Sequence, residues 1–261
     1  MIRKAWITLI VVVATLAAFS LAGCKGTATR PVNNPPPTNT SATGVWGGID
    51  SVTGLSVSGF IDSNGNAVFI RSDGVQFVGP TQASGGTLVA AVIVYTNFGS
   101  TFSDGSTYGL GTLNGTFVAG TSLTLSLSFK TNSGTAGSGT WSLTFNTLTD
   151  SGSSLTTLNA NYTDTASGTV LSISGGVITG QNAANSCVVN GMVTIINSSY
   201  DTYEVSLTYQ NCTGSYAVLN GVTLKGLAFY NPNTSPAQLT ISVEGASATS
   251  KFGIVLDLQT T

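Results

Sequence analysis

The stretch SLTLSLSF, residues 122–129, alternates a small polar side chain with Leu or Phe along its whole length. Successive side chains of an extended strand point to opposite faces, so this pattern produces one apolar and one polar face. The same alternation recurs at residues 141–145, 203–209, 239–243 and 254–258. No stretch of eleven residues carries a convincing helical stripe. The sequence therefore predicts an all-β, antiparallel body from about residue 44 onward.

Turn-forming residues separate these predicted strands at short intervals. They occur at Ser63-Asn64-Gly65, Asp73-Gly74, Asp104-Gly105, Asn114-Gly115, Asn220-Gly221 and Pro232-Asn233. Asn-Gly and Asp-Gly pairs adopt the left-handed backbone conformations that tight hairpins require. The pattern favours small barrels or sandwiches built from hairpins.

Two short matches indicate an internal duplication. Gly44-Val-Trp46 resembles Gly139-Thr-Trp141, and Thr112-Leu-Asn-Gly115 resembles Thr223-Leu-Lys-Gly226. Between them lies a Gly- and Ser-rich segment, residues 131–138. We therefore expect two related β-domains, residues 44–131 and residues 139–261. One larger continuous sandwich is the alternative, and two barrels that share a strand would give the same pattern.

The N-terminus has the organisation of an export signal. Arg3 and Lys4 precede an apolar run over residues 5–21, which ends on the small residues Ala22 and Gly23. A basic start, an apolar core and a small-residue cleavage site are the features of secretory signals. The run of about 17 residues is at the lower limit for spanning a bilayer, so a transmembrane helix is the alternative.

Leu21-Ala22-Gly23-Cys24 resembles the lipobox of bacterial lipoproteins. The resemblance implies a signal peptide over residues 1–23, a diacylglycerol on the Cys24 thiol, and Cys24 as the first residue of the mature protein. Several acyl chains on one residue anchor a protein to a membrane without a spanning helix. In Gram-negative lipoproteins an Asp after the cysteine retains the protein at the inner membrane. Lys25 stands there instead, which implies the outer membrane.

Residues 24–43 hold four of the seven prolines and one large apolar residue, Val32. Such a segment buries too little surface to offset the entropy of ordering, and its prolines favour an extended chain. We expect a disordered tether that holds the folded body away from the membrane.

Charge and composition exclude several classes of function. Loss of residues 1–23 removes two of the eight basic side chains and none of the ten acidic ones, which leaves a net charge of about −4. The β-body keeps only Arg71, Lys130, Lys225 and Lys251 as cations, so nucleic-acid binding is not expected. The chain has no histidine, which removes His-based catalytic triads and His-ligated metals.

Most of the Asp residues are predicted to lie in turns. Asp62, Asn64 and Asn66 have the spacing of a calcium loop, but Ala67 stands where that loop needs glycine. We therefore expect a hairpin turn at Asn64-Gly65 instead of a calcium site. Paired carboxylates remain conceivable as glycosidase machinery, although most of the Asp residues fall at turns. We therefore predict a protein that is not an enzyme, with no catalytic residue, no metal and no cofactor.

Cys187 and Cys212 are the other cysteines, and both fall in the second predicted domain. Exported proteins mature in an oxidising compartment, so we expect a structural disulfide between them. Free thiols, or a metal site built from these cysteines, are the alternatives.

The chain as a whole is similar to outer-membrane lipoproteins of proteobacteria that carry small β-barrels on a proline-rich tether. The likeness rests on the G-x-W pattern and on CVVNG, residues 187–191. It implies a non-catalytic envelope protein that binds a protein partner or a small apolar ligand, with a structural or surface-coat role as the alternative. The sequence does not identify ligand-binding residues. The aromatic residues are expected in the core: Trp46, Phe60, Phe69, Phe77, Trp141 and Phe145.

The lipobox generates a direct test. Cys24→Ser is expected to abolish the incorporation of labelled palmitate, because serine offers no thiol for acylation. Cys212→Ser is the matched control and should keep the label. Palmitate on the Cys24→Ser protein would contradict the lipoprotein assignment.

Overall fold

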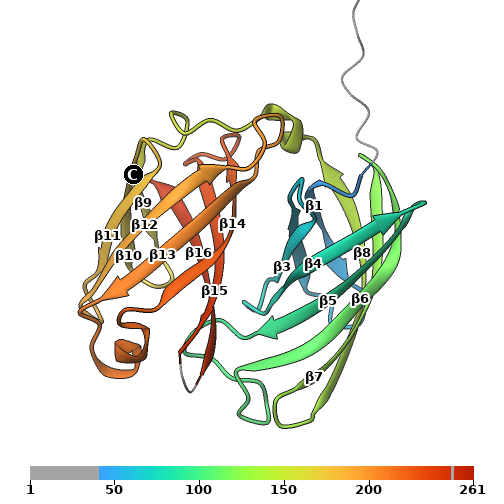
Figure 1. The fold of residues 1–261 in the computed structure, drawn as a ribbon, viewed down its shortest axis with the longest axis horizontal. Helices are drawn as coiled ribbons and strands as arrows, with labels where there is room; N and C mark the ends of the chain where they lie inside the picture. The colour runs from blue at the N-terminus through green and yellow to red at the C-terminus, as the bar shows by residue number, and fades with distance from the viewer. Residues whose placement is uncertain (1–40, 248–249) are drawn as a thin grey trace, which may run out of the picture. The chain divides into compact units, whose positions relative to one another are not determined.

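The computed structural model describes residues 41–247 and 250–261 (Figure 1). The predicted signal peptide, Cys24 and most of the tether therefore lie outside the described residues. The first eight strands of the described chain are β1 (Gly44–Asp50), β2 (Ser56–Ile61), β3 (Asn66–Arg71), β4 (Gln76–Ser84), β5 (Thr87–Tyr95), β6 (Tyr108–Val118), β7 (Ser122–Thr131) and β8 (Ala136–Asn146). Within the described residues, no helix combines the length and the apolar character needed to cross a membrane.

The second half of the chain repeats this arrangement. Its strands are β9 (Ala160–Asp164), β10 (Thr169–Ser174), β11 (Val177–Asn182), β12 (Cys187–Ile195), β13 (Tyr203–Gln210), β14 (Thr223–Asn231), β15 (Gln238–Ala246) and β16 (Lys251–Thr260). Short 3-10 helices lie at η1 (Thr147–Ser151) and η2 (Gly214–Leu219).

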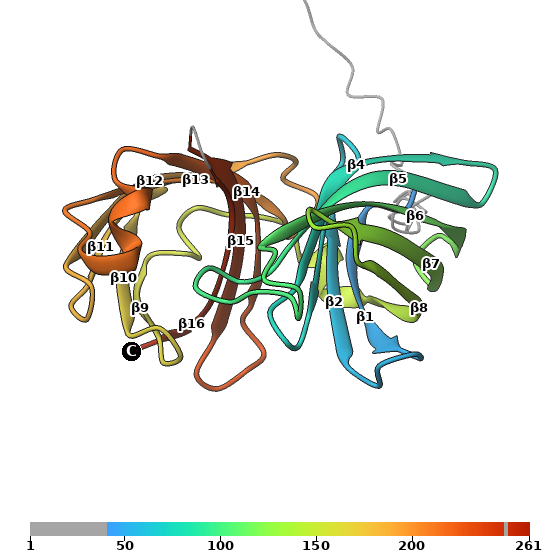
Figure 2. The same cartoon turned by 90° about the horizontal axis from the view of Figure 1, so that it is seen from below.

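Each set of strands closes into an antiparallel barrel (Figure 1, Figure 2). Within each barrel consecutive strands pair, and β1 also pairs with β8, with Trp46 opposite Phe145. In the second barrel β16 pairs with β9, with Leu258 opposite Asp164. Closure pairs the backbone groups that the edge strands of an open sheet would leave exposed. The all-β, antiparallel prediction is confirmed, with barrels in place of the alternative continuous sandwich.

The boundary between the barrels lies later than the sequence indicated. We expected a linker over residues 131–138 and a second domain from Gly139. Instead β8 contains Gly139 and Trp141 and pairs with both β7 and β1. The connection between the barrels runs over residues 147–159. The Gly- and Ser-rich segment is the tight β7–β8 hairpin, where Gly134 adopts a left-handed φ of 94°.

The start of the folded body also differs from the expected tether boundary at residue 43. Ala42 and Thr43 are buried against the first barrel. Ala42 accepts a hydrogen bond from Trp46 Nε1 at 2.9 Å, and Thr43 Oγ1 donates to the carbonyl of Asp62 at 3.3 Å. The last residues of the predicted tether therefore belong to the fold.

The structural duplication is real, but only one of the two sequence matches identifies equivalent strands. Thr112–Gly115 lies in β6 and Thr223–Gly226 in β14, each the sixth strand of its barrel. A Cβ at either glycine would collide with a backbone carbonyl of the next strand, that of Thr124 or Ser242. Asn114-Gly115, predicted as a turn, is therefore a strand segment that needs glycine for close approach to its neighbour.

In the first strand of the second barrel, Tyr162 makes a contact like that of Trp46, although Tyr162 lies two residues before Asp164 and Trp46 lies four residues before Asp50. Tyr162 Oη donates to the carbonyl of Leu158 at 3.0 Å, four residues earlier, as Trp46 does to Ala42. The turns that follow also match in sequence, Asp50-Ser-Val-Thr-Gly54 and Asp164-Thr-Ala-Ser-Gly168. In both turns the aspartate Oδ1 accepts the backbone N–H two residues on, at 3.0 and 2.9 Å.

The first barrel is filled by aromatic side chains. Trp46, Phe69, Phe77 and Trp141 are each 0% exposed. The ring centroid of Trp141 lies 5.4 Å from that of Phe69 and 4.8 Å from that of Phe77. These four residues confirm the predicted core, and Phe145 packs against it while partly buried. Phe60 is buried too, but on the outer side of the barrel.

The predicted disulfide is confirmed. Cys187 at the start of β12 is bonded to Cys212 in the loop that follows β13, with their Cα atoms 4.0 Å apart. Both side chains belong to the core of the second barrel. The bond therefore ties the long β13–β14 loop, which contains η2, to the neighbouring β-hairpin.

Candidate binding cleft

An apolar seam joins the outer walls of the barrels. Val45, Phe60 and Val68, from β1, β2 and β3, form one buried cluster with Leu227 and Phe229 from β14. The rings of Phe60 and Phe229 are stacked, with centroids 5.7 Å apart and planes 28° apart. Outward-facing residues of this size would otherwise contact water, so burying them favours barrel–barrel contact.

Hydrogen bonds flank this seam. Ser242 Oγ on β15 donates to Gln76 Oε1 on β4 at 2.6 Å, and the bond is buried. The backbone N–H of Val255 on β16 donates to Asn97 Oδ1 at 3.1 Å. Directional bonds of this kind fix the register of one wall on the other, which an apolar contact alone would not do.

The connection between the barrels adds a further link through Thr149 in η1. Its hydroxyl accepts the backbone N–H of Val45 at 2.8 Å. Its carbonyl accepts the backbone N–H of Asp201, also at 2.8 Å. Thr149 is 0% exposed, so one buried residue bonds to both barrels.

Beside the seam lies a cleft of about 720 Å³ that both barrels line. The first barrel contributes polar side chains from β2, from the end of β3 and the turn after it, and from the β5–β6 loop, among them Ser58, Arg71, Asp73 and Asn97. The second contributes residues of β14, β15 and β16 and of the β9–β10 turn, among them Asn231, Gln238, Thr240, Asp257 and Asp164. Phe60, Phe98, Tyr216 and Phe229 add aromatic surface. The volume falls in the range of about 300 to 1,000 Å³ that small-molecule sites occupy.

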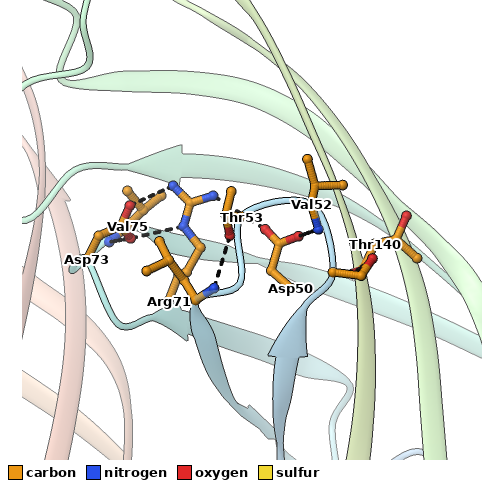
Figure 3. Close-up of polar contacts among 9 residues, drawn as sticks. Asp50, Val52, Thr53, Arg71, Asp73, Val75 and Thr140 are labelled. Atoms are coloured by element: carbon orange, nitrogen blue, oxygen red, sulfur yellow. Dashed lines mark hydrogen bonds and ion pairs between the residues drawn. The ribbon is translucent and has the colours of Figure 1, made fainter.

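Arg71 is held in place at the margin of this cleft (Figure 3). Its Nε lies 3.0 Å from Asp73 Oδ1 and its Nη2 lies 2.7 Å from Asp73 Oδ2, which is a two-point contact. On the other side, Nη1 lies 3.6 Å from Asp50 Oδ2. Because the guanidinium lies between two carboxylates, its position is fixed and its charge is neutralised locally.

Asp50 is the buried member of this group, with 0% exposure. Burial alone would raise the pKa of its carboxyl. Contacts with the backbone and side chain of Thr53, with the N–H of Val52 and with the Trp141 indole outweigh burial and hold the pKa below its usual value. The Arg71 side chain likewise holds the pKa of Asp73 below its usual range, against the opposing effect of burial. Both carboxyls are therefore ionised at neutral pH.

The opposite wall of the cleft is acidic. Asp164 is 3% exposed and its Oδ2 accepts from Ser167 Oγ at 2.8 Å. Asp257 accepts from Thr240 Oγ1 at 3.0 Å. The Asp257 side chain is exposed, but partial desolvation in the cleft, with the nearby charge of Asp164, raises its pKa against the effect of the Thr240 hydrogen bond. With Arg71, Asp73, Asp164 and Asp257 as its charged lining residues, the described cleft has a formal charge of −2 when all four are ionised.

The predicted disulfide and the predicted calcium-like turn do not line this cleft. Cys24 is outside the described residues, and neither Cys187 nor Cys212 lines the cleft. Asp62 Oδ1 accepts the backbone N–H groups of Asn64 and Asn66, both at 2.8 Å, which is the expected hairpin turn. Residues 41–247 and 250–261 contain no group of three or more His, Cys, Asp or Glu that could hold a metal ion.

Comparison with known proteins adds no assignment. No protein-family model, no curated protein and no solved structure matches this chain.

Removal of the arginine charge is expected to destabilise the protein. Arg71→Met leaves the carboxylate of Asp50 buried without its cation, and the loss of one partner of a buried pair costs about 3 kcal/mol. Adding Asp50→Asn to Arg71→Met should recover part of this loss, because the buried charge is then absent. Lys130→Met, at an exposed position, is the control and should change the unfolding free energy by less than about 0.5 kcal/mol.

Urea unfolding at several pH values measures the change in unfolding free energy and its dependence on pH. The pKa values of Asp50 and Asp73 are lowered on folding, so their stabilisation is present above the unfolded pKa near 4 and is lost as pH falls through the folded pKa. Arg71→Met should move that loss to higher pH. Equal acid sensitivity of the wild-type protein and Arg71→Met would contradict the role assigned to Arg71.

Proposed function

We propose that this protein is a non-catalytic binding module of the cell envelope, attached to the outer membrane through lipid on Cys24. Its binding surface is the cleft between the barrels. The observation that carries the proposal is that both barrels contribute side chains to one open cleft, while the interior of each barrel is occupied by its own core.

Because the interior of each barrel is filled, the cleft is a better candidate for the binding site than the inside of a barrel. Barrels that hold such ligands keep an internal cavity for them. Here Trp46 and Trp141 fill the first barrel, and Tyr162 and Tyr203 are buried within the second. A ligand at these positions would have to displace well-packed aromatic side chains.

The chemistry of the cleft favours a protein partner. Its neutral hydroxyl and amide groups can pair with the backbone of an extended peptide, and its aromatic side chains offer contact area. The acidic wall formed by Asp164 and Asp257 favours basic side chains. We therefore expect the partner to insert a polar or basic segment between the barrels.

Site-specific photo-crosslinking in intact cells tests this proposal. A photoreactive amino acid at Asn231, which lines the cleft, is expected to give a discrete adduct with an envelope protein. The same probe at Ser126, on the exposed outer face of β7, is the control and should give none. Asp257→Lys should reduce the Asn231 adduct severalfold, because it reverses the charge of the acidic wall.

Two results would contradict this proposal. Absence of any adduct from Asn231 would favour the structural or surface-coat role over a binding role. An adduct of the same mass from Ser126 would show that the capture does not depend on the cleft.

A further inference from the structure

Asp201 is a buried acid at the place where the connection between the barrels meets the second barrel. It lies in the loop between β12 and β13, and its side chain is 2% exposed. Its Oδ1 atom is closed off from solvent and has no hydrogen-bond partner among the described residues. Buried carboxylates are normally paired or hydrogen-bonded, because burial disfavours their charged form. The negative charge of an ionised Asp201 would therefore be poorly compensated in this position.

The surroundings of Asp201 offer no compensating cation among the described residues. The side chain borders a hollow of about 320 Å³ with Tyr203 on β13 and Tyr230 on β14, and no Lys or Arg lines that hollow. The other titratable groups of the surrounding elements are Asp150 in η1, which is exposed, and Tyr200 in the same loop, and neither can supply a positive charge. Burial raises the pKa of Asp201 to about 7, against the lowering effect of the Tyr203 hydroxyl. This carboxyl is therefore neutral in mildly acidic solution and ionised in mildly alkaline solution.

Few other groups of this protein change charge in that interval. The chain has no histidine, the side chain that ordinarily titrates between about pH 5 and pH 8. Asp50 and Asp73, whose pKa values are lowered, stay ionised throughout it. The pKa of Asp257 is raised, but its side chain is exposed in the cleft, so its ionisation requires no rearrangement of buried structure. Ionisation of Asp201, by contrast, takes place inside the fold.

The backbone of Asp201 is part of the link between the barrels. Its N–H donates to the carbonyl of Thr149 at 2.8 Å, and the Thr149 hydroxyl accepts the N–H of Val45 on β1, also at 2.8 Å. Beside this link the N–H of Ser153 donates to the carbonyl of Ser198 at 3.2 Å. These bonds hold the β12–β13 loop against the connection between the barrels. The Asp201 side chain can gain hydration only if this loop moves away from the connection.

We propose that Asp201 makes the contact between the barrels sensitive to pH, because its ionisation draws the β12–β13 loop toward water and weakens the link through Thr149. The barrels are then held together more tightly in mildly acidic than in mildly alkaline solution. The proposal concerns the contact itself and holds whether or not the cleft takes a partner.

The sign of the effect follows from proton binding. The folded protein keeps a proton on Asp201 that the unfolded chain releases, so unfolding sets a proton free. Stability therefore falls as pH rises from the unfolded pKa near 4 to the folded pKa near 7, and changes no further above it. One released proton raises the unfolding equilibrium constant by up to about tenfold per pH unit in this interval.

Equilibrium unfolding of the purified full-length protein in urea, between about pH 5 and pH 8, tests this dependence. Asp201→Asn places a neutral amide at the same position and should remove the dependence. Asp150→Asn, which changes an exposed aspartate in η1, is the matched control and should keep it. Tyr203→Phe removes the hydroxyl that lowers the pKa of Asp201, so the loss of stability should extend to higher pH.

Amide hydrogen exchange tests the link itself. The N–H groups of Val45 and Asp201 both donate to Thr149. Their protection factors, corrected for the intrinsic pH dependence of exchange, should fall severalfold more between about pH 6 and pH 8 than those of amides in β7, a strand that none of these bonds involves. In the Asp201→Asn protein the protection of Val45 should be the same at both pH values.

Three results would overturn the proposal. The first is an equal pH dependence of unfolding in the wild-type protein and a folded Asp201→Asn protein. If that variant does not fold, an unchanged pH dependence in Tyr203→Phe has the same meaning. The third is a loss of protection at Val45 and Asp201 no larger than that in β7, because ionisation would then act on the whole fold and not on the link.

Discussion

The stacking of Phe60 on Phe229 lies at the centre of the contact on which the functional architecture depends. Each barrel closes on itself and could satisfy its backbone without the other. The cleft would not exist without both barrels, because its walls come from different barrels. Each large apolar side chain buried at the seam contributes roughly 1.5 to 3 kcal/mol. The flanking bond from Ser242 to Gln76 then fixes the alignment of the walls.

The fold class was predictable from the sequence, because the alternation of apolar and polar residues has the period of a strand and little else competes with it. The boundary was not predictable in the same way. Trp141 repeats the motif around Trp46, but it is the neighbour of the first strand, opposite Asp50, and not its counterpart. On the first strand of the second barrel, Tyr162 differs in residue type from Trp46 and shares with it a hydrogen bond to the carbonyl four residues earlier. This shared hydrogen bond is seen in the structure and could not be predicted from the residue types alone.

The binding surface was even less predictable from the sequence than the domain boundary. Period-two patterning shows which residues share a face of a strand, but it does not show which outer face meets another barrel. Phe60 therefore resembled a core residue, although it faces outward into the seam. The cleft joins Arg71 to Asp257, far apart in the chain, through a contact that no local pattern encodes. The disulfide was predictable because Cys187 and Cys212 had no other cysteine partner once Cys24 was assigned to the lipid.

The claim that the seam makes the barrels one binding unit can be measured by differential scanning calorimetry of the full-length protein. If the seam couples the barrels, unfolding should be a single transition in which the calorimetric and van't Hoff enthalpies agree. Phe229→Asp, which places a charge in the seam, should then split this transition in two. Two separate transitions in the wild-type protein, unchanged by Phe229→Asp, would contradict the account, because the walls of the cleft would then not be held together.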